Sequence, residues 1–168
     1  MRRIKLLFLG MGVVMGIQLP HSIAFAQEAP KIQSEFSRPY HPEADAQKDI
    51  DSLLKLAKKE KKNVIIQAGG NWCVWCLRFN DYIHKTASID KLLKSRFLYY
   101  HLNYSKENKN EAVFQKYAPE GGKLGYPFFI VLDINGKTLH IQESGSMEKD
   151  KSYDEEKVLK FFNTWVAK

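Results

Sequence analysis

The chain has 168 residues, of which 44% are hydrophobic and 27% are charged, as is ordinary for one soluble globular domain. These proportions exclude a disordered or collagen-like chain, and ten glycines and six prolines are too few for a low-complexity linker protein. Two cysteines allow at most one intramolecular disulfide and exclude a zinc site made of four cysteines. The formal net charge is +7.

Residues 1–26 carry the three parts of a secretory signal peptide. A basic head ends at Lys5, an uncharged apolar segment runs from Leu6 to Pro20, and Ala24-Phe25-Ala26 closes the stretch. The segment is shorter than the roughly 20 apolar residues that span a membrane. We therefore expect cleavage after this tripeptide and a periplasmic or secreted protein, with an uncleaved anchor as the alternative.

Removal of the signal peptide changes the charge that a partner would meet. It takes away three of the 26 Lys and Arg but none of the 19 Asp and Glu, which leaves a net charge of +4 spread along the chain. Such a dispersed charge does not favour a nucleic-acid partner. We expect none.

The predicted domain covers residues 43–168 and follows a lead-in at 27–42. The lead-in mixes proline and polar residues without a period, so we expect it to be exposed and flexible. From Glu43 an apolar stripe at helical spacing predicts a helix that ends near Lys62-Asn63. The stripe consists of Ile50, Leu53, Leu54 and Ala57.

Strands and helices then alternate along the chain. Runs of β-branched and aromatic residues predict strands at 64–66, 96–103, 128–134 and 137–143, the last two joined by the turn signal Asn135-Gly136. Helices are expected from about Cys76 to Lys85, within 107–117, and after a capping box formed by Ser152 and Glu155, with a short helix or turn at 88–94 and a loop at 119–125. Because a helix joins the first two strands, we expect them to be parallel, whereas the hairpin is antiparallel. The order predicts an α/β fold with a central mixed sheet and helices on both faces.

Cys73 and Cys76 are the strongest candidates for chemistry. They follow a strand of the buried type at the start of a helix, and their spacing places both sulfurs within one helical turn, close enough to form and break a disulfide. The helix N-terminus favours a thiolate at Cys73, and the thiolate is the species that attacks a disulfide. Cys76 would then be the resolving thiol.

Two other roles compete with redox chemistry. A structural disulfide around so short a loop would contribute only about 2 kcal/mol, against about 3 kcal/mol for a 15-residue loop. A metal site would need ligands besides the two sulfurs, from His84, His101, Met147 or a partner protein. Haem attachment is excluded because Leu77, not histidine, follows Cys76. We favour redox chemistry and expect no metal.

The stretch Val64–Cys76, VIIQAGGNWCVWC, followed about 50 residues later by Gly125-Tyr126-Pro127 and an apolar strand, resembles the thioredoxin superfamily. It is most similar to the C-terminal periplasmic domain of the transmembrane thiol:disulfide interchange protein and its stand-alone relatives. The resemblance implies a thioredoxin-like three-layer fold and a cis peptide bond between Tyr126 and Pro127, beside the cysteines. It also implies that Trp72, Trp75, Tyr126 and Pro127 shape the surface on which a substrate docks.

The sequence departs from this family at three places. Many members have an acidic residue six positions before the first cysteine as a proton acceptor, but an amide, Gln67, stands here. Many carry lysine just after the second cysteine, where this chain has Leu77 and then Arg78. The stretch Tyr104–Gly122 is long and polar, which suits either partner selection or a tolerated surface insertion.

The prediction is an exported thiol–disulfide oxidoreductase that reduces, or exchanges, protein disulfides. It needs no organic cofactor, because the Cys73–Cys76 disulfide stores the two electrons, and in an oxidising compartment a membrane electron donor must recharge it. We expect a monomer. The alternative is a non-catalytic thioredoxin-like binding module, or a copper or zinc carrier that uses the same two cysteines.

Overall fold

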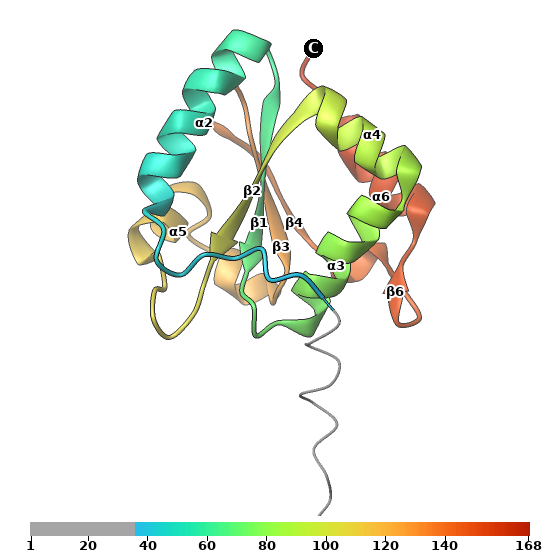
Figure 1. Ribbon diagram of the computed structural model, residues 1–168. Helices are drawn as coiled ribbons and strands as arrows, with labels where there is room; N and C mark the ends of the chain where they lie inside the picture. Colours follow the sequence, from blue (N-terminus) through green and yellow to red (C-terminus); the bar gives the residue numbers. More distant parts are fainter. Residues whose placement is uncertain (1–35) are drawn as a thin grey trace, which may run out of the picture.

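The computed structural model describes residues 36–168, in which a four-stranded sheet is covered by helices on both faces (Figure 1). The sheet strands are β1 (Asn63–Gly69), β2 (Phe97–Asn103), β3 (Phe128–Leu132) and β4 (Thr138–Glu143), and a separate pair is β5 (Glu148–Lys149) and β6 (Ser152–Tyr153). The helices are α2 (Ala46–Glu60), α3 (Val74–Lys85), α4 (Ala87–Arg96), α5 (Glu111–Tyr117) and α6 (Glu155–Thr164), with short 3-10 helices η1 (Gly121–Leu124) and η2 (Gly145–Met147). The predicted signal peptide lies outside the described residues.

The strand order is β2-β1-β3-β4, which confirms the predicted mixed sheet. β1 and β2 run parallel, with Gln67 opposite His101, whereas β3 is antiparallel to both β1 and β4. All seven residues of β1 are buried, as expected for a strand covered on both faces. The buried end of this central strand therefore fixes the position of the segment that follows Gly69 and leads into α3.

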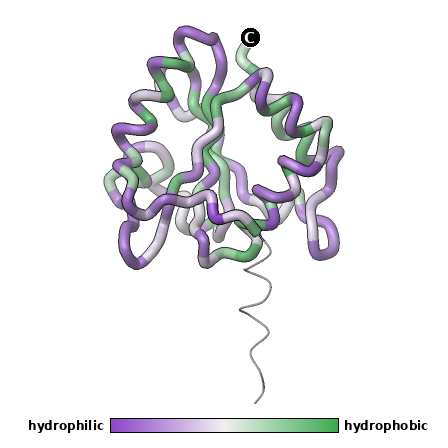
Figure 2. Tube along the Cα trace, viewed as in Figure 1, coloured by the Kyte–Doolittle hydropathy of each residue, from purple (hydrophilic) through white to green (hydrophobic). Residues whose placement is uncertain are grey.

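Two apolar cores lie on the two faces of the sheet. Val64 and Ile66 of β1 pack in the core under α2 and α5, and Ile65 packs in the other core, under α3, α4 and α6. This alternation follows from the two-residue period of a strand. The α2 and α5 helices lie on one side of the sheet in Figure 1 and the other three on the opposite side. Along the trace, the central strands are mostly hydrophobic, and the outer turns of the helices carry the hydrophilic residues (Figure 2).

Several predicted boundaries were wrong. The capping box of Ser152 and Glu155 does not form, because Ser152 pairs with Lys149 in β6 and the N-cap of α6 is Asp154, whose carboxylate accepts the N–H of Lys157 at 3.2 Å. The loop expected at 119–125 contains η1. The helix expected within 107–117 is confirmed as α5, which covers Glu111–Tyr117. The exposed lead-in does not extend to Tyr40, which is 1% exposed.

Candidate active site

A disulfide joins Cys73 and Cys76 at the N-terminus of α3 (sulfurs 2.13 Å apart). The central strand β1 ends at Gly69, and the Cys73 N–H donates to the carbonyl of Gly70 at 3.0 Å, which turns the chain into the helix. Cys73 is the N-cap residue, so both sulfurs lie on one element as the spacing predicts. Cys73 keeps 6% of its surface exposed and Cys76 none. Of the two, only Cys73 is open to a partner.

The start of α3 provides an electrostatic environment that suits a thiolate. The Cys76 N–H donates to the Cys73 sulfur at 3.1 Å, and the first turn of the helix contains no acidic residue. A hydrogen bond to the sulfur and the positive end of the helix dipole both stabilise negative charge there. In the reduced protein these groups favour the thiolate form of Cys73.

Trp72 and Tyr126 flank the disulfide on the side of β3. Trp72 is 50% exposed, its indole N–H donates to the carbonyl of Tyr104 at 2.6 Å, and its ring meets Tyr126 edge to face with centroids 5.6 Å apart. The peptide bond between Tyr126 and the buried Pro127 is cis, as the resemblance implied. Tyr126 also packs against the two cysteines. The structure thus brings Trp72, Tyr126 and Pro127 together on one side of the disulfide, and Trp75 packs against the same cluster.

Trp75 is placed differently from Trp72. Its ring packs edge to face on Tyr153 at 5.6 Å and lies under the guanidinium of Arg78 at 5.0 Å. The hydroxyl of Tyr153 donates to the Trp75 carbonyl at 3.1 Å, so this turn of α3 is fixed against β6. Trp75 contacts both the disulfide cluster and the larger core, which gives it a packing role at the site.

Comparison with known proteins places this site in a family. Residues 45–133 match the family described as Thioredoxin-like. The chain belongs to that family. A disulfide isomerase from Xylella fastidiosa Temecula1 has a similar structure at 22% identity, with 76% of this chain and 96% of that one covered and a TM-score of 0.66. A structure described as a DsbH oxidoreductase is 19% identical, covers 67% of this chain and 78% of that one, and has a TM-score of 0.51.

No curated protein matches the sequence. The thioredoxin-like fold with a Cys-x-x-Cys disulfide at the start of a helix is the site of a thiol–disulfide oxidoreductase. Within residues 36–168 no three His, Cys, Asp or Glu side chains lie together as a metal site would require. In the same part of the chain, no helix has the length and apolar character to cross a membrane.

In this thioredoxin-like protein, Gln67 lies beneath the disulfide with every polar atom of its amide engaged. Its Nε2 donates to the Cys76 carbonyl at 3.0 Å and to the Tyr40 hydroxyl at 2.6 Å, and its Oε1 accepts from the Tyr99 hydroxyl at 2.7 Å. Burial raises the pKa of both tyrosines well above the usual value, so their hydroxyls are neutral. The amide at the position where the resemblance implied an acid is thus fully hydrogen-bonded within the site.

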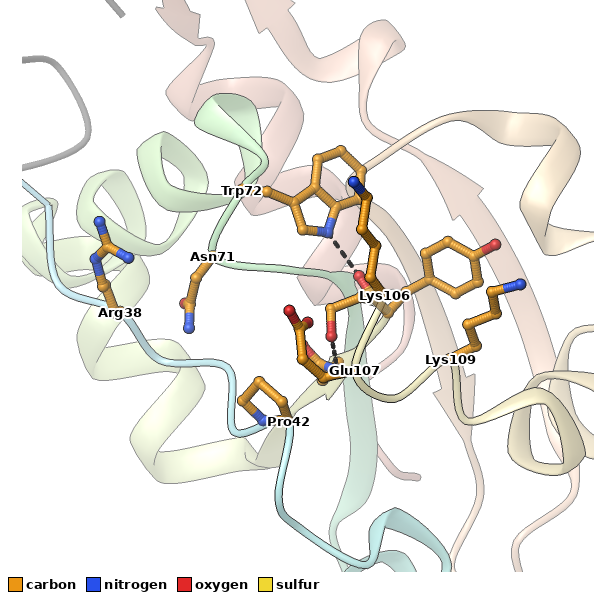
Figure 3. Close-up of a pocket in the computed structure, with 10 residues that line it drawn as sticks. Arg38, Pro42, Asn71, Trp72, Lys106, Glu107 and Lys109 are labelled. Carbon is orange, nitrogen blue, oxygen red and sulfur yellow. Dashed lines mark hydrogen bonds between the residues drawn. The ribbon is translucent and has the colours of Figure 1, made fainter. Parts of the chain in front are cut away.

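A pocket of about 630 Å³ opens beside Trp72 (Figure 3). Its walls come from the lead-in at Arg38 and Pro42, from Asn71 and Trp72, and from the loop at 103–109. Arg38 extends from one side of this pocket and Lys106 and Lys109 from the other, with Glu107 as the acidic residue among the lining side chains. No local sequence pattern indicated this pocket, because two of its walls lie outside the Cys-x-x-Cys segment.

An asparagine network holds the loop that forms one wall of the pocket. Asn103 Nδ2 donates to the Asn108 carbonyl at 2.8 Å, Asn108 Nδ2 to the Pro42 carbonyl at 2.9 Å, and Asn110 Nδ2 to the Asn103 carbonyl at 2.8 Å. These bonds fix the loop to β2 and to the lead-in. Three asparagines within eight residues are the signal by which the sequence could have revealed an ordered loop.

Proposed function

We propose that the protein is an exported thiol–disulfide oxidoreductase that reduces disulfides of other proteins. The observation that carries this proposal is the Cys73–Cys76 disulfide at the N-terminus of α3, in which Cys73 keeps 6% of its surface exposed and Cys76 none. The two similar structures are described as a disulfide isomerase and an oxidoreductase, chemistry of the same class. Export is supported by the basic head and apolar segment of residues 1–26.

The reaction needs only the two sulfurs of the reduced protein. The Cys73 thiolate attacks one sulfur of the substrate disulfide, forms a mixed disulfide and releases the other substrate sulfur as a thiolate. Cys76 then attacks the Cys73 sulfur and releases the second substrate thiol. Two electrons pass to the substrate and the Cys73–Cys76 disulfide reforms, so no organic cofactor takes part. A membrane electron donor returns the two electrons, because the compartment is oxidising.

The substrate docks across Trp72 and the cis-proline segment, with its flanking residues in the neighbouring pocket. Trp72 offers a half-exposed aromatic surface, and Arg38, Lys106 and Lys109 give the pocket rim more positive than negative charge. Opposite charge across such a surface raises the association rate and fixes orientation. We therefore expect a preference for disulfides that have an acidic residue nearby.

A disulfide-reduction assay on Cys73→Ala and Cys76→Ala, each compared with the wild type, tests the activity. The two variants are matched controls for each other. Both lose the Cys73–Cys76 disulfide, and they differ only in which of the two sulfurs remains. We expect near-total loss of turnover for Cys73→Ala and accumulation of mixed disulfides for Cys76→Ala. Wild-type turnover in both variants, with loss of copper or zinc binding instead, would establish the carrier function.

Export is tested separately by the mass of the protein recovered outside the cytoplasm. Cleavage after Ala26 gives a chain that begins at Gln27. Intact Met1 in the membrane fraction would show an uncleaved anchor instead.

A further inference from the structure

Tyr40 packs beside the buried resolving cysteine, Cys76. It forms a small buried cluster with Cys73 and Cys76, apart from the two larger cores. A methyl carbon added at Gly69 would lie within 3.0 Å of both the Cys76 sulfur and the Tyr40 hydroxyl oxygen. The hydroxyl and the sulfur therefore border the same small space, which stays open because residue 69 has no side chain.

The hydrogen bonds of Gln67 determine which way the Tyr40 hydroxyl can act. The Cys76 carbonyl can only accept, so the amide group that faces it is the Nε2 donor. The same Nε2 donates to the Tyr40 oxygen, and the Oε1 on the other side accepts from Tyr99. The Tyr40 oxygen is thus an acceptor toward Gln67, and its own proton remains to be donated.

We propose that the Tyr40 hydroxyl donates a hydrogen bond to the Cys76 sulfur as that sulfur becomes a thiolate, and so promotes the resolving step. The proposal rests on the proposed function, because it assigns a role within that reaction. Tyr40 lies in the lead-in, before the residues that match the family, 45–133.

The histidine that contacts Tyr40 does not supply a cation for the same task. The ring of His101 meets Tyr40 edge to face at 5.1 Å, but burial lowers its pKa to about 4, so it is neutral at pH 7. The neighbouring Tyr99 donates to Gln67 rather than to the sulfur. Tyr40 stays protonated because burial holds its pKa well above the usual value, so it acts as a donor and not as a base.

The step balances without another reagent. In the mixed disulfide, Cys76 carries the proton and Cys73 is bonded to the substrate sulfur. As Cys76 attacks, the new sulfur–sulfur bond to Cys73 forms and the bond to the substrate breaks. The substrate sulfur takes the electron pair of the broken bond and, through solvent, the proton lost by Cys76. Tyr40 keeps its own proton throughout.

Tyr40→Phe tests the proposal, because it keeps the ring and removes only the hydroxyl. The reduced protein is mixed with dithiobis(nitrobenzoate), which releases one coloured thiolate when Cys73 attacks and a second when Cys76 resolves. Loss of a hydrogen bond to a charged group lowers the thiolate population on the order of ten- to hundredfold. The higher basicity of the remaining thiolate offsets about half of this on a logarithmic scale. We expect the second release to slow about three- to tenfold, while the first is unchanged.

A second readout is the pKa of Cys76 in the Cys73→Ala background, followed by the ultraviolet absorbance of the thiolate. We expect Tyr40→Phe to raise this pKa by about 1–2. The comparison variant is Tyr99→Phe, which removes the other hydroxyl bonded to Gln67 but keeps the Tyr40 hydroxyl, and it should shift both readouts less than Tyr40→Phe does. Equal effects of the two variants, or an unchanged second release in Tyr40→Phe, would overturn the proposal.

A further variant should shift the pKa of Cys76 in the opposite direction. Site-specific Tyr40→3-fluorotyrosine keeps the hydroxyl and strengthens it as a donor, so it should lower the pKa of Cys76. This variant keeps the proposal testable if Tyr40→Phe fails to fold, and an unchanged or raised pKa would contradict it. If Cys73→Ala abolishes turnover while the Tyr40 variants change nothing, the proposed function stands and only this inference fails.

Discussion

Gly69→Ala probes how closely the end of β1 approaches the disulfide. The backbone of Gly69 is not in the left-handed region, so a methyl group adds no backbone strain. The new carbon would, however, lie closer than 3.0 Å to the Cys76 sulfur. In the oxidised protein this sulfur is bonded to Cys73 and has little room to move, whereas in the reduced protein it can rotate away. The clash therefore falls mainly on the oxidised state.

The size of the effect follows from the cost of overpacking. Extra methyl groups in a packed interior cost about 1–3 kcal/mol. For a two-electron couple about 30 mV corresponds to 1.4 kcal/mol, so the reduction potential should rise by about 20–60 mV. The added methyl group would also crowd the Tyr40 hydroxyl, equally in the oxidised and the reduced protein. This second contact lowers the stability of both states and does not change the reduction potential.

The assay equilibrates each protein in glutathione buffers, traps free thiols by alkylation and counts them by mass. Gly122→Ala is the matched control, because a methyl group there meets no atom within 4 Å and should leave the potential unchanged. A folded Gly69→Ala protein whose potential equals that of the wild type, or lies below it, would refute the steric argument.

Two further predictions concern His101, which contacts Tyr40, and Lys106, which lines the pocket. Because burial lowers the pKa of His101 to about 4, from about 6.5 in the unfolded chain, the unfolded state takes up this proton first as the pH falls. Stability should then drop by up to about 3 kcal/mol between pH 6.5 and pH 4. Urea unfolding of His101→Phe should show a flatter profile over that range, and an equally steep one would contradict the assignment. At the pocket, Lys106→Glu should lower kcat/KM roughly three- to tenfold for a disulfide peptide with a neighbouring Asp but not for one with Lys there. Lys91→Glu on α4 is the control, and equal losses for both peptides would argue against a charge-selective pocket.

The elements predicted correctly from the sequence are those in which the spacing of apolar residues follows directly from which side chains are buried. The continuous β-branched run Val64–Ile66 indicated a strand covered on both faces, and β1 is buried along its whole length. The signal Asn135-Gly136 gave the hairpin between β3 and β4, where Gly136 has φ 84°. The capping of α6 was mispredicted because Ser152 and Asp154 are both good N-cap residues, and the pairing of β5 with β6 decides between them.

In the candidate site, too, the features that depend on neighbouring residues could be predicted, whereas those that depend on contacts between distant residues could not. Cys73 and Cys76 could be placed on one helical turn because their geometry depends on four consecutive residues. Tyr40 could not, because its partner Gln67 lies 27 residues further along the chain and in a different element. Its flanking residues, polar and proline-rich, predicted exposure, and only the tertiary fold shows the ring to be buried.

The amide of Gln67 and the hydroxyl of Tyr40 have complementary hydrogen-bonding roles. A carboxylate at position 67 would direct an oxygen at the Cys76 carbonyl, which can only accept, so an ionised acid would repel it there. The amide instead donates to that carbonyl and to the tyrosine oxygen, and it leaves the tyrosine proton free to act on the sulfur. Without the tyrosine, the glutamine would still donate only to the Cys76 carbonyl and not to the sulfur. The tyrosine is held in place by Gln67 at its hydroxyl and by Asn71 at its backbone. Gln67 in β1 and Tyr40 in the lead-in therefore form one hydrogen-bonded unit, although only Gln67 lies within the residues that match the family.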